Sequence, residues 1–364
     1  MRPLASRHSI GQRMLDRRRL LVLALPLLAA CGAVDETVAP ASLLAAPASV
    51  AAHDGYALVE LPIPGGVGGA ANDINARGQI VGSILSASGD ERAALWDQGA
   101  THDLGTLPGD WLSVALGINE AGTIVGYSYG PSGIRAVSWR QQVIAPLDVS
   151  PSAGFAAAVA IASRGTVVGD GWDDTFANHA FAWNRGAATF LGSSAVDDAS
   201  AAVGVNARGD VVGWVLNGGT SYATAWRNGA RELLPQRPGH LRSQAYGINA
   251  AGQVVGASGT VGPDYELATR AVLWDKGQAI DLGTPGGAEA SASAISEPGA
   301  VVGQGLTASG EVVAWIWEGG VMSTLPIPPG GAAIASSINH HGDVVGRLDR
   351  GFGSVPVVWR RARP

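Results

Sequence analysis

One phrase of eight residues constrains this chain more than any other feature. The pattern Asn-x-x-Gly-x-(Ile/Val)-Val-Gly recurs through residues 75–346, and in two copies Ala162 or Ser296 replaces the asparagine. Its copies lie 43 to 47 residues apart. This period is typical of one four-stranded propeller blade, whereas solenoid repeats are usually shorter or helical. Seven copies predict a seven-bladed β-propeller, and their closing residues are Gly82, Gly126, Gly169, Gly213, Gly256, Gly303 and Gly346.

A tryptophan occupies the same position in every repeat. We expect these side chains in the core between blades rather than at a ligand, because large aromatic rings contribute most when buried. Reflection of the sequence about Gly89 and Gly310 also predicts that each indole covers a cross-strand glycine, with Trp96 opposite Gly82. The repeated tryptophans are Trp96, Trp139, Trp183, Trp226, Trp274, Trp317 and Trp359.

The second repeat divides into four strands, A to D from the propeller axis outward. Residues 114–118, 123–127, 135–140 and 142–147 are the predicted strands, and Asn119 and Gly122 delimit a tight A–B turn. Residues 158–160 and 291–294 of the A strands have small side chains, as seven strands around one axis require. This indicates an all-β fold with four antiparallel strands per blade.

The two ends of the repeat region complement each other. The last repeat stops after its strand C at Trp359, and a D-like segment, residues 56–61, precedes the first repeat. Pairing of these segments would close the ring without an open sheet edge. We therefore expect the propeller to occupy residues 55–364.

Composition agrees with this class of fold. Glycine makes up 52 of 364 residues, 46% of the residues are hydrophobic and 15% are charged. The hydrophobic share is too high for a disordered chain, and this much glycine would weaken long helices.

Residues 1–30 resemble a bacterial lipoprotein signal peptide. Arg17–Arg19 precede an apolar run, residues 20–28, and small residues then lead to Cys31. We expect Cys31 to be lipidated, residues 31–54 to form an Ala/Pro-rich tether, and translation to begin at Met1 or Met14. Gly32 favours the outer membrane or cell surface, and a plain secretory signal releasing the protein is the alternative.

Charge and cysteine content limit the partners. Without residues 1–30 the chain has 18 basic and 29 acidic side chains, a net charge of −11. Nucleic-acid binding needs a basic surface, so we expect none. Cys31 is the only cysteine, which excludes an intramolecular disulfide. We expect a monomer without a cofactor that meets the membrane through its lipid.

These motifs resemble those of the HAF-repeat family of extracellular repeat proteins. The resemblance rests on His179-Ala180-Phe181 with Trp183, on residues 103–107 (Asp-Leu-Gly-Thr-Leu), and on residues 117–119 leading to 125–126. It covers about residues 55–360. Arg135 and Arg270 replace the histidine in two other repeats. The resemblance implies an extracellular repeat protein and supplies no catalytic residues.

Three possible chemistries have a simpler structural interpretation. Ser128 lies in a Gly-x-Ser-x-Gly sequence, but this pattern activates serine only on a strand–turn–helix elbow. Asp173-Asp174 and Asp197-Asp198 lack the spacing of a zinc or calcium site, so we predict no metal. Glycosidase chemistry needs two facing carboxylates, which a sequence cannot identify.

We expect a non-enzymatic binding or scaffold protein of the cell envelope, with a glycan or protein ligand. The alternative is an extracytoplasmic glycan-active hydrolase or lyase that uses acids on the face formed by the variable loops. The A–B and C–D turns are short and uniform, whereas the B–C and D–A loops vary, and ligands bind preferentially to variable loops. The candidate ligand-binding residues are Trp111, Tyr129, Trp172, Asp173, Asp174, Phe176, Trp214, Tyr222, Tyr265, Asp349 and Arg350.

Overall fold

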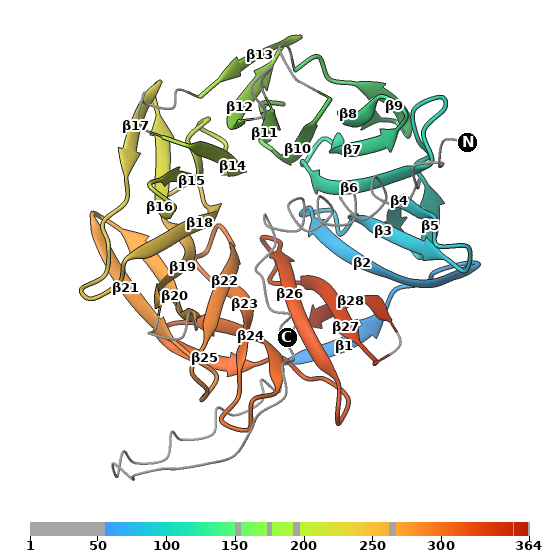
Figure 1. Ribbon diagram of the computed structural model, residues 1–364. Coiled ribbons are helices and arrows are strands. Elements are labelled where there is room, and N and C mark those ends of the chain that lie inside the picture. The colour runs from blue at the N-terminus through green and yellow to red at the C-terminus, as the bar shows by residue number, and fades with distance from the viewer. Residues whose placement is uncertain are drawn as a thin grey trace, which may run out of the picture. The chain divides into compact units, whose positions relative to one another are not determined.

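The computed structural model describes residues 55–149, 154–172, 177–191, 197–261, 267–351 and 353–362. Its regular elements within these ranges are 28 β-strands in seven four-stranded sheets. The sheets surround a central axis as the blades of a propeller (Figure 1). The predicted all-β, seven-bladed β-propeller with four antiparallel strands per blade is therefore confirmed.

Blades 1 to 6 each use four consecutive strands, in the order A, B, C, D from the axis outward. Blade 1 contains β2 (Gly66–Ile74), β3 (Ile80–Ser86), β4 (Glu91–Asp97) and β5 (Ala100–Asp103). Blade 2 contains β6 (Leu112–Ile118), β7 (Ile124–Gly130), β8 (Gly133–Arg140) and β9 (Val143–Pro146). Blade 3 contains β10 (Ala156–Ile161), β11 (Val167–Trp172), β12 (Asn178–Asn184) and β13 (Ala187–Phe190).

The next three blades follow the same order. Blade 4 contains β14 (Ala199–Val205), β15 (Val211–Asn217), β16 (Thr220–Arg227) and β17 (Ala230–Leu233). Blade 5 contains β18 (Arg242–Ile248), β19 (Val254–Val261), β20 (Leu267–Asp275) and β21 (Gln278–Gly283). Blade 6 contains β22 (Ala290–Ile295), β23 (Val301–Leu306), β24 (Val312–Glu318) and β25 (Val321–Thr324).

Blade 7 combines the two ends of the described chain. It contains β26 (Ala332–Ile338), β27 (Val344–Asp349), β28 (Ser354–Arg361) and, as its outermost strand, β1 (Tyr56–Glu60). β1 pairs antiparallel with β28 from Tyr56 opposite Arg361 to Glu60 opposite Val357. This is the predicted ring closure, with the strand ending at residue 60 instead of 61.

The closing glycine of each repeat lies opposite a β-bulge. All seven A–B strand pairs contain a register shift in strand A, for example between Ala115 and Gly117. A Cβ on any closing glycine would overlap a carbonyl oxygen of the bulged strand, such as that of Val114 at Gly126. Only glycine fits where the two backbones approach this closely.

The predicted tryptophan–glycine pairing is wrong. Trp96 lies opposite Ile80, and Gly82 lies opposite Ala94. The β3–β4 hairpin pairs Leu85 with Glu91, so it reflects about residue 88 rather than Gly89, and every partner moves by two positions. Trp317 likewise lies opposite Val301. Steric conflict with the bulge, and not coverage by an indole, therefore accounts for the glycines.

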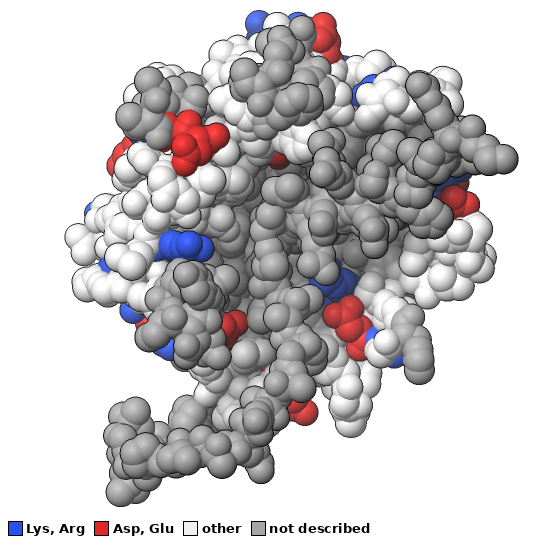
Figure 2. Space-filling model, viewed as in Figure 1, with Lys and Arg blue, Asp and Glu red and all other residues white. Residues whose placement is uncertain are grey.

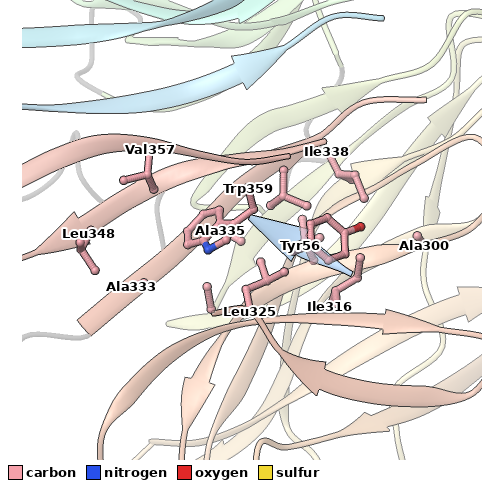
Figure 3. Packing of buried hydrophobic residues seen from close by; sticks show 13 residues of the cluster. Tyr56, Ala300, Ile316, Leu325, Ala333, Ala335, Ile338, Leu348, Val357 and Trp359 are labelled. Carbon is pink, nitrogen blue, oxygen red and sulfur yellow. The ribbon is translucent and has the colours of Figure 1, made fainter. Parts of the chain in front are cut away.

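The repeated tryptophans lie between blades, as expected. Seven hydrophobic clusters each combine residues of two neighbouring blades. Figure 3 shows the cluster between blades 6 and 7, where Trp359 and Tyr56 pack near Ile316 and Leu325. Four indoles also donate at 2.8 Å to a carbonyl just after strand D of the preceding blade, as Trp139 does to Leu104.

The repeated asparagines form a second set of links between blades. The Asn75 side chain accepts hydrogen bonds from two N–H groups of its own A–B turn and donates to the carbonyl of Asn119 in the next blade. Asn119, Asn206, Asn249 and Asn339 make the equivalent donation, and Asn339 reaches Asn75 across the ring closure. The repeat phrase thus encodes both the turn and the contact to the next turn.

The bulge predicts a specific cost for Gly256→Ala. A Cβ at this position would overlap the Gln244 carbonyl, so the free energy of unfolding should fall by about 1–3 kcal/mol. Gly353→Ala is the matched control, because its Cβ would sit 3.6 Å from the Val67 carbonyl, an ordinary contact. Urea unfolding measures both variants, and equal stabilities would contradict the steric role of the glycine.

Candidate ligand-binding face

The connections between strands define two different faces of the ring. The A–B links all contain five residues, from 75–79 in blade 1 to 339–343 in blade 7, and with the two-residue C–D links they form what we call the turn face. The B–C and D–A links form the opposite, variable face. Its D–A links range from residues 61–65 to residues 147–155. The predicted contrast between uniform and variable connections is therefore present.

Aromatic pairs occupy the variable face in two neighbouring blades. Trp111 enters blade 2 with 47% of its surface exposed and meets Tyr129 edge to face, at a centroid distance of 5.3 Å. In blade 3, Trp172 stacks on Phe155 at 4.7 Å. Tyr129 and Trp172 occupy equivalent positions near the ends of their B strands, three residues after the closing glycine. The structure thus groups three predicted residues in neighbouring blades and adds Phe155, which the sequence analysis missed.

A groove of about 400 Å³ lies beside these pairs, between blades 2 and 3. Its lining includes the apolar side chains of Ile134 and Val149 and the exposed carboxylate of Asp148. Ile134 pairs with Tyr129 across β7 and β8, and its N–H donates to the Gly154 carbonyl at 3.1 Å. The groove and the aromatic pair of blade 2 therefore share one end of the same blade.

Two further predicted site residues, Trp214 and Tyr222, lie within strands and away from any long loop. Trp214 is in the middle of β15, between Ala201 and Ala223 of the neighbouring strands. Tyr222 belongs to β16 and packs against the cluster between blades 3 and 4. The predicted loop between them is wrong, because β15 and β16 extend until only Gly218 and Gly219 separate them.

The remaining predicted residues are placed elsewhere or not at all. Asp349 ends β27, 3.5 Å from Arg347, and Arg350 forms an ion pair with Glu60. These residues lie in blade 7, which blade 1 separates from blade 2. Cys31, Asp173, Asp174, Phe176 and Tyr265 lie outside the described residues.

Ser128 lies in a buried hydrogen-bond network. It is fully buried in β7, donates to Asp110 at 2.7 Å and accepts the Leu107 N–H at 3.1 Å. Arg135 donates at 2.7 Å to the other oxygen of the Asp110 carboxylate, whose side chain is buried. The Gly-x-Ser-x-Gly sequence is thus part of a strand, and its serine forms hydrogen bonds to the D–A link that connects blades 1 and 2.

An unusual carboxylate lies near the axis. Asp73 of β2 accepts the Ile118 N–H of blade 2 at 2.9 Å and the Ser337 hydroxyl of blade 7 at 2.7 Å. Burial raises the pKa of Asp73 from 3.8 to about 6, although these hydrogen bonds act in the opposite direction. One side chain therefore connects three blades where the ring closes.

Two further observations concern the described part of the chain. It contains no group of three His, Cys, Asp or Glu side chains placed to hold a metal ion. None of its elements is a helix long and apolar enough to cross a membrane.

Comparisons with known proteins show the class of fold alone. No family model matches the chain, and no curated protein does. The chain is similar to the β-propeller domain of the Trilobed protease from Pyrococcus furiosus, with a TM-score of 0.54, 8% identity, and coverage of 82% of this chain and 97% of that one.

Two peptidase structures are also similar. A puromycin-hydrolysing peptidase from Mycobacterium tuberculosis has a TM-score of 0.52 and 11% identity over 81% of this chain and 51% of that one. A puromycin hydrolase gives 0.53 and 14%, over 88% and 52%. The chain thus spans about half the length of both peptidases. At these identities the similarity shows the β-propeller fold alone, and this fold serves many functions.

Asp73 should make stability depend on pH. Its pKa is raised on folding, so its contribution is fully present below the unfolded value near 4 and is lost as pH rises through about 6. We expect the free energy of unfolding of the wild type, relative to Asp73→Asn, to fall by about 2 kcal/mol between pH 4 and pH 7. Urea unfolding at both pH values tests this, and parallel profiles of the two proteins would refute it.

Proposed function

We propose that this chain is a non-enzymatic, lipid-anchored binding protein of the cell envelope whose ligand is a glycan. The observation that carries the proposal is the set of aromatic rings on the variable face of blades 2 and 3. Trp111 and Tyr129 lie beside a groove, and Trp172 occupies the position of Tyr129 one blade further on. Such rings present flat apolar surfaces with polar edges, which suit a saccharide.

The state of two buried acids of the variable face supports a binding role over glycan hydrolysis. The side chains of Asp110 and Asp197 are both 1% exposed on this face, and each forms an ion pair, with Arg135 and Arg231 respectively. A glycosidase needs one carboxyl group to donate a proton and a second to attack or to activate water. Acids held by arginines in the wall of the ring are poorly suited to either task.

The proposed site of lipid attachment is Cys31, which lies outside the described residues. A lipid there would tether the propeller through residues 32–54, which could span roughly 75 Å when extended. The resemblance to HAF-repeat proteins supports an extracellular position. A scaffold role for an envelope protein follows from the same surface if a protein, and not a glycan, occupies the groove.

The aromatic residues on the variable face of blades 2 and 3, which we call the aromatic face, can be tested once a glycan array has identified a ligand of the purified chain. Trp111→Ala and Trp172→Ala should each weaken binding at least about tenfold, since exposed aromatic anchors carry much of the energy of such contacts. Arg77→Ala, on the exposed turn face, is the control. Calorimetry measures the affinities and circular dichroism checks folding. Loss of affinity in the control alone would place the ligand on the other face.

The anchor is tested separately. Labelled palmitate should be incorporated into the wild type expressed in a bacterial host, and Cys31→Ser should abolish incorporation and release the protein from membranes. Serine is a close steric replacement for cysteine, but it has no sulfur atom and so cannot form the thioether that carries the lipid. Equal labelling of both proteins would contradict lipidation at Cys31.

A further inference from the structure

Two D–A links of the variable face share one backbone arrangement. Residues 104–111 lead into blade 2, and residues 234–241 lead into blade 5. The Asp110 N–H donates to the Leu107 carbonyl, and the His240 N–H donates to the Arg237 carbonyl, both at 3.0 Å. The next N–H in each link donates to a carbonyl of its own strand B. The links can therefore be compared residue by residue.

In blade 2 the charges at this arrangement balance. The buried carboxylate of Asp110 accepts hydrogen bonds from Arg135 and Ser128, both at 2.7 Å. One acid thus neutralises one guanidinium, and the side chain of Asp110 is almost completely enclosed.

Blade 5 replaces the acid with a histidine. His240 stands at the position of Asp110, and its Nδ1 lies 2.7 Å from the hydroxyl of Ser258. Its Nε2 lies 3.2 Å from Arg237 Nη1. Because a guanidinium only donates hydrogen bonds, Nε2 must accept and Nδ1 must carry the proton. Burial and the charge of Arg237 lower the pKa of His240, which disfavours its charged form, and unlike Asp110 it supplies no negative charge to Arg237.

Among the described residues, the remaining charges of this cluster do not cancel. Arg237 and Arg270 both contact Oδ2 of Asp281, at 2.8 and 3.2 Å, while Oδ1 accepts the Gly283 N–H at 2.9 Å. Two guanidiniums thus share one carboxylate. Arg270 is 35% exposed, and Asp281 is its only hydrogen-bond partner among the described residues. Leu241, which follows His240, is 64% exposed.

The surface around blade 5 agrees with this excess of positive charge. Figure 2 shows one compact patch of basic atoms over the region of β18. The chain as a whole is acidic, with a formal net charge of −6. An exposed cationic cluster in such a chain attracts anions locally against the overall field.

We propose that Arg237 and Arg270 form a carboxylate-binding site on the variable face of blade 5. The free N–H groups of Arg270 match the two oxygens of a carboxylate, and the planar fork of arginine favours this bidentate geometry. Leu241 provides an apolar contact for the body of the ligand. The acid is either a uronic acid of a saccharide or a side-chain carboxylate of a peptide. This site goes beyond the aromatic face of blades 2 and 3 and uses none of its residues.

The experiment titrates the full-length 15N-labelled chain with defined acids. The probes are glucuronate, N-acetylglutamate amide, sulfate and the neutral control glucose, and the readout is the arginine Nε–H signals in NMR spectra. We expect saturable shifts with a carboxylate probe. Arg270→Gln should weaken binding at least about tenfold, and Arg270→Lys should restore only part of it, because lysine keeps the charge but not the fork.

The matched control is Arg208→Gln, which removes the same charge from the turn face, where Arg208 pairs with Asp210. Glucuronate binding alone would identify an acidic saccharide, and equal binding of both acids would identify the carboxylate itself as the determinant. Absence of saturable shifts with either acid, equal binding of sulfate, or equal weakening by Arg208→Gln would overturn the proposal. Trp111→Ala should leave the carboxylate shifts unchanged, so this test fails or succeeds independently of the aromatic face.

Discussion

The asparagine at the start of five of the seven repeats connects the folding of a single hairpin to the assembly of the ring. Its side-chain oxygen caps its own A–B turn, and its amide donates to the backbone of the next turn, so one residue orders one hairpin and positions its neighbour. A buried hydrogen bond of this kind contributes about 1 kcal/mol. Two positions differ: Ala162 has no amide, and the hydroxyl of Ser296 is used within its own turn. At the first junction the hydrophobic cluster that includes Trp226 must suffice, and at the second the cluster is joined by the hydrogen bond from Trp359 to Pro326.

The repeat pattern was enough to predict the architecture because every blade solves the same packing problem. Period, turn residues and the displaced strand at residues 56–60 are all local signals, and each survives in one sequence. The bulge in strand A was not predictable in this way. It depends on how two backbones pair, and reflection of the sequence about Gly89 misplaced the tryptophans by two positions. Hairpin register follows from the closing turn, which the sequence only approximates.

The candidate site was predictable only in part, for a related reason. Trp111 was identified because it lies in one of the variable connections, where binding residues concentrate. Trp214 and Tyr222 were misplaced because a strand can extend until a loop disappears. The charge of Arg270 could not be interpreted at all from its sequence neighbours, since its partner Asp281 lies on β21 and is shared with Arg237 of a D–A link. Comparison of blades supplies that information, because the repeated backbone acts as its own reference.

The pairing of β1 with β28 also has a consequence for the order of assembly. The first described strand must wait for the last, so closure joins segments about 300 residues apart in the sequence. Contacts of such high sequence separation are slow to form, because the chain between them has to be confined first. As the chain emerges from its N-terminus, six blades can complete their sheets from consecutive strands, while blade 7 has only its outermost strand. Until β26, β27 and β28 arrive, β1 is an unpaired edge, and any factor that accompanies the nascent chain has this one strand to protect.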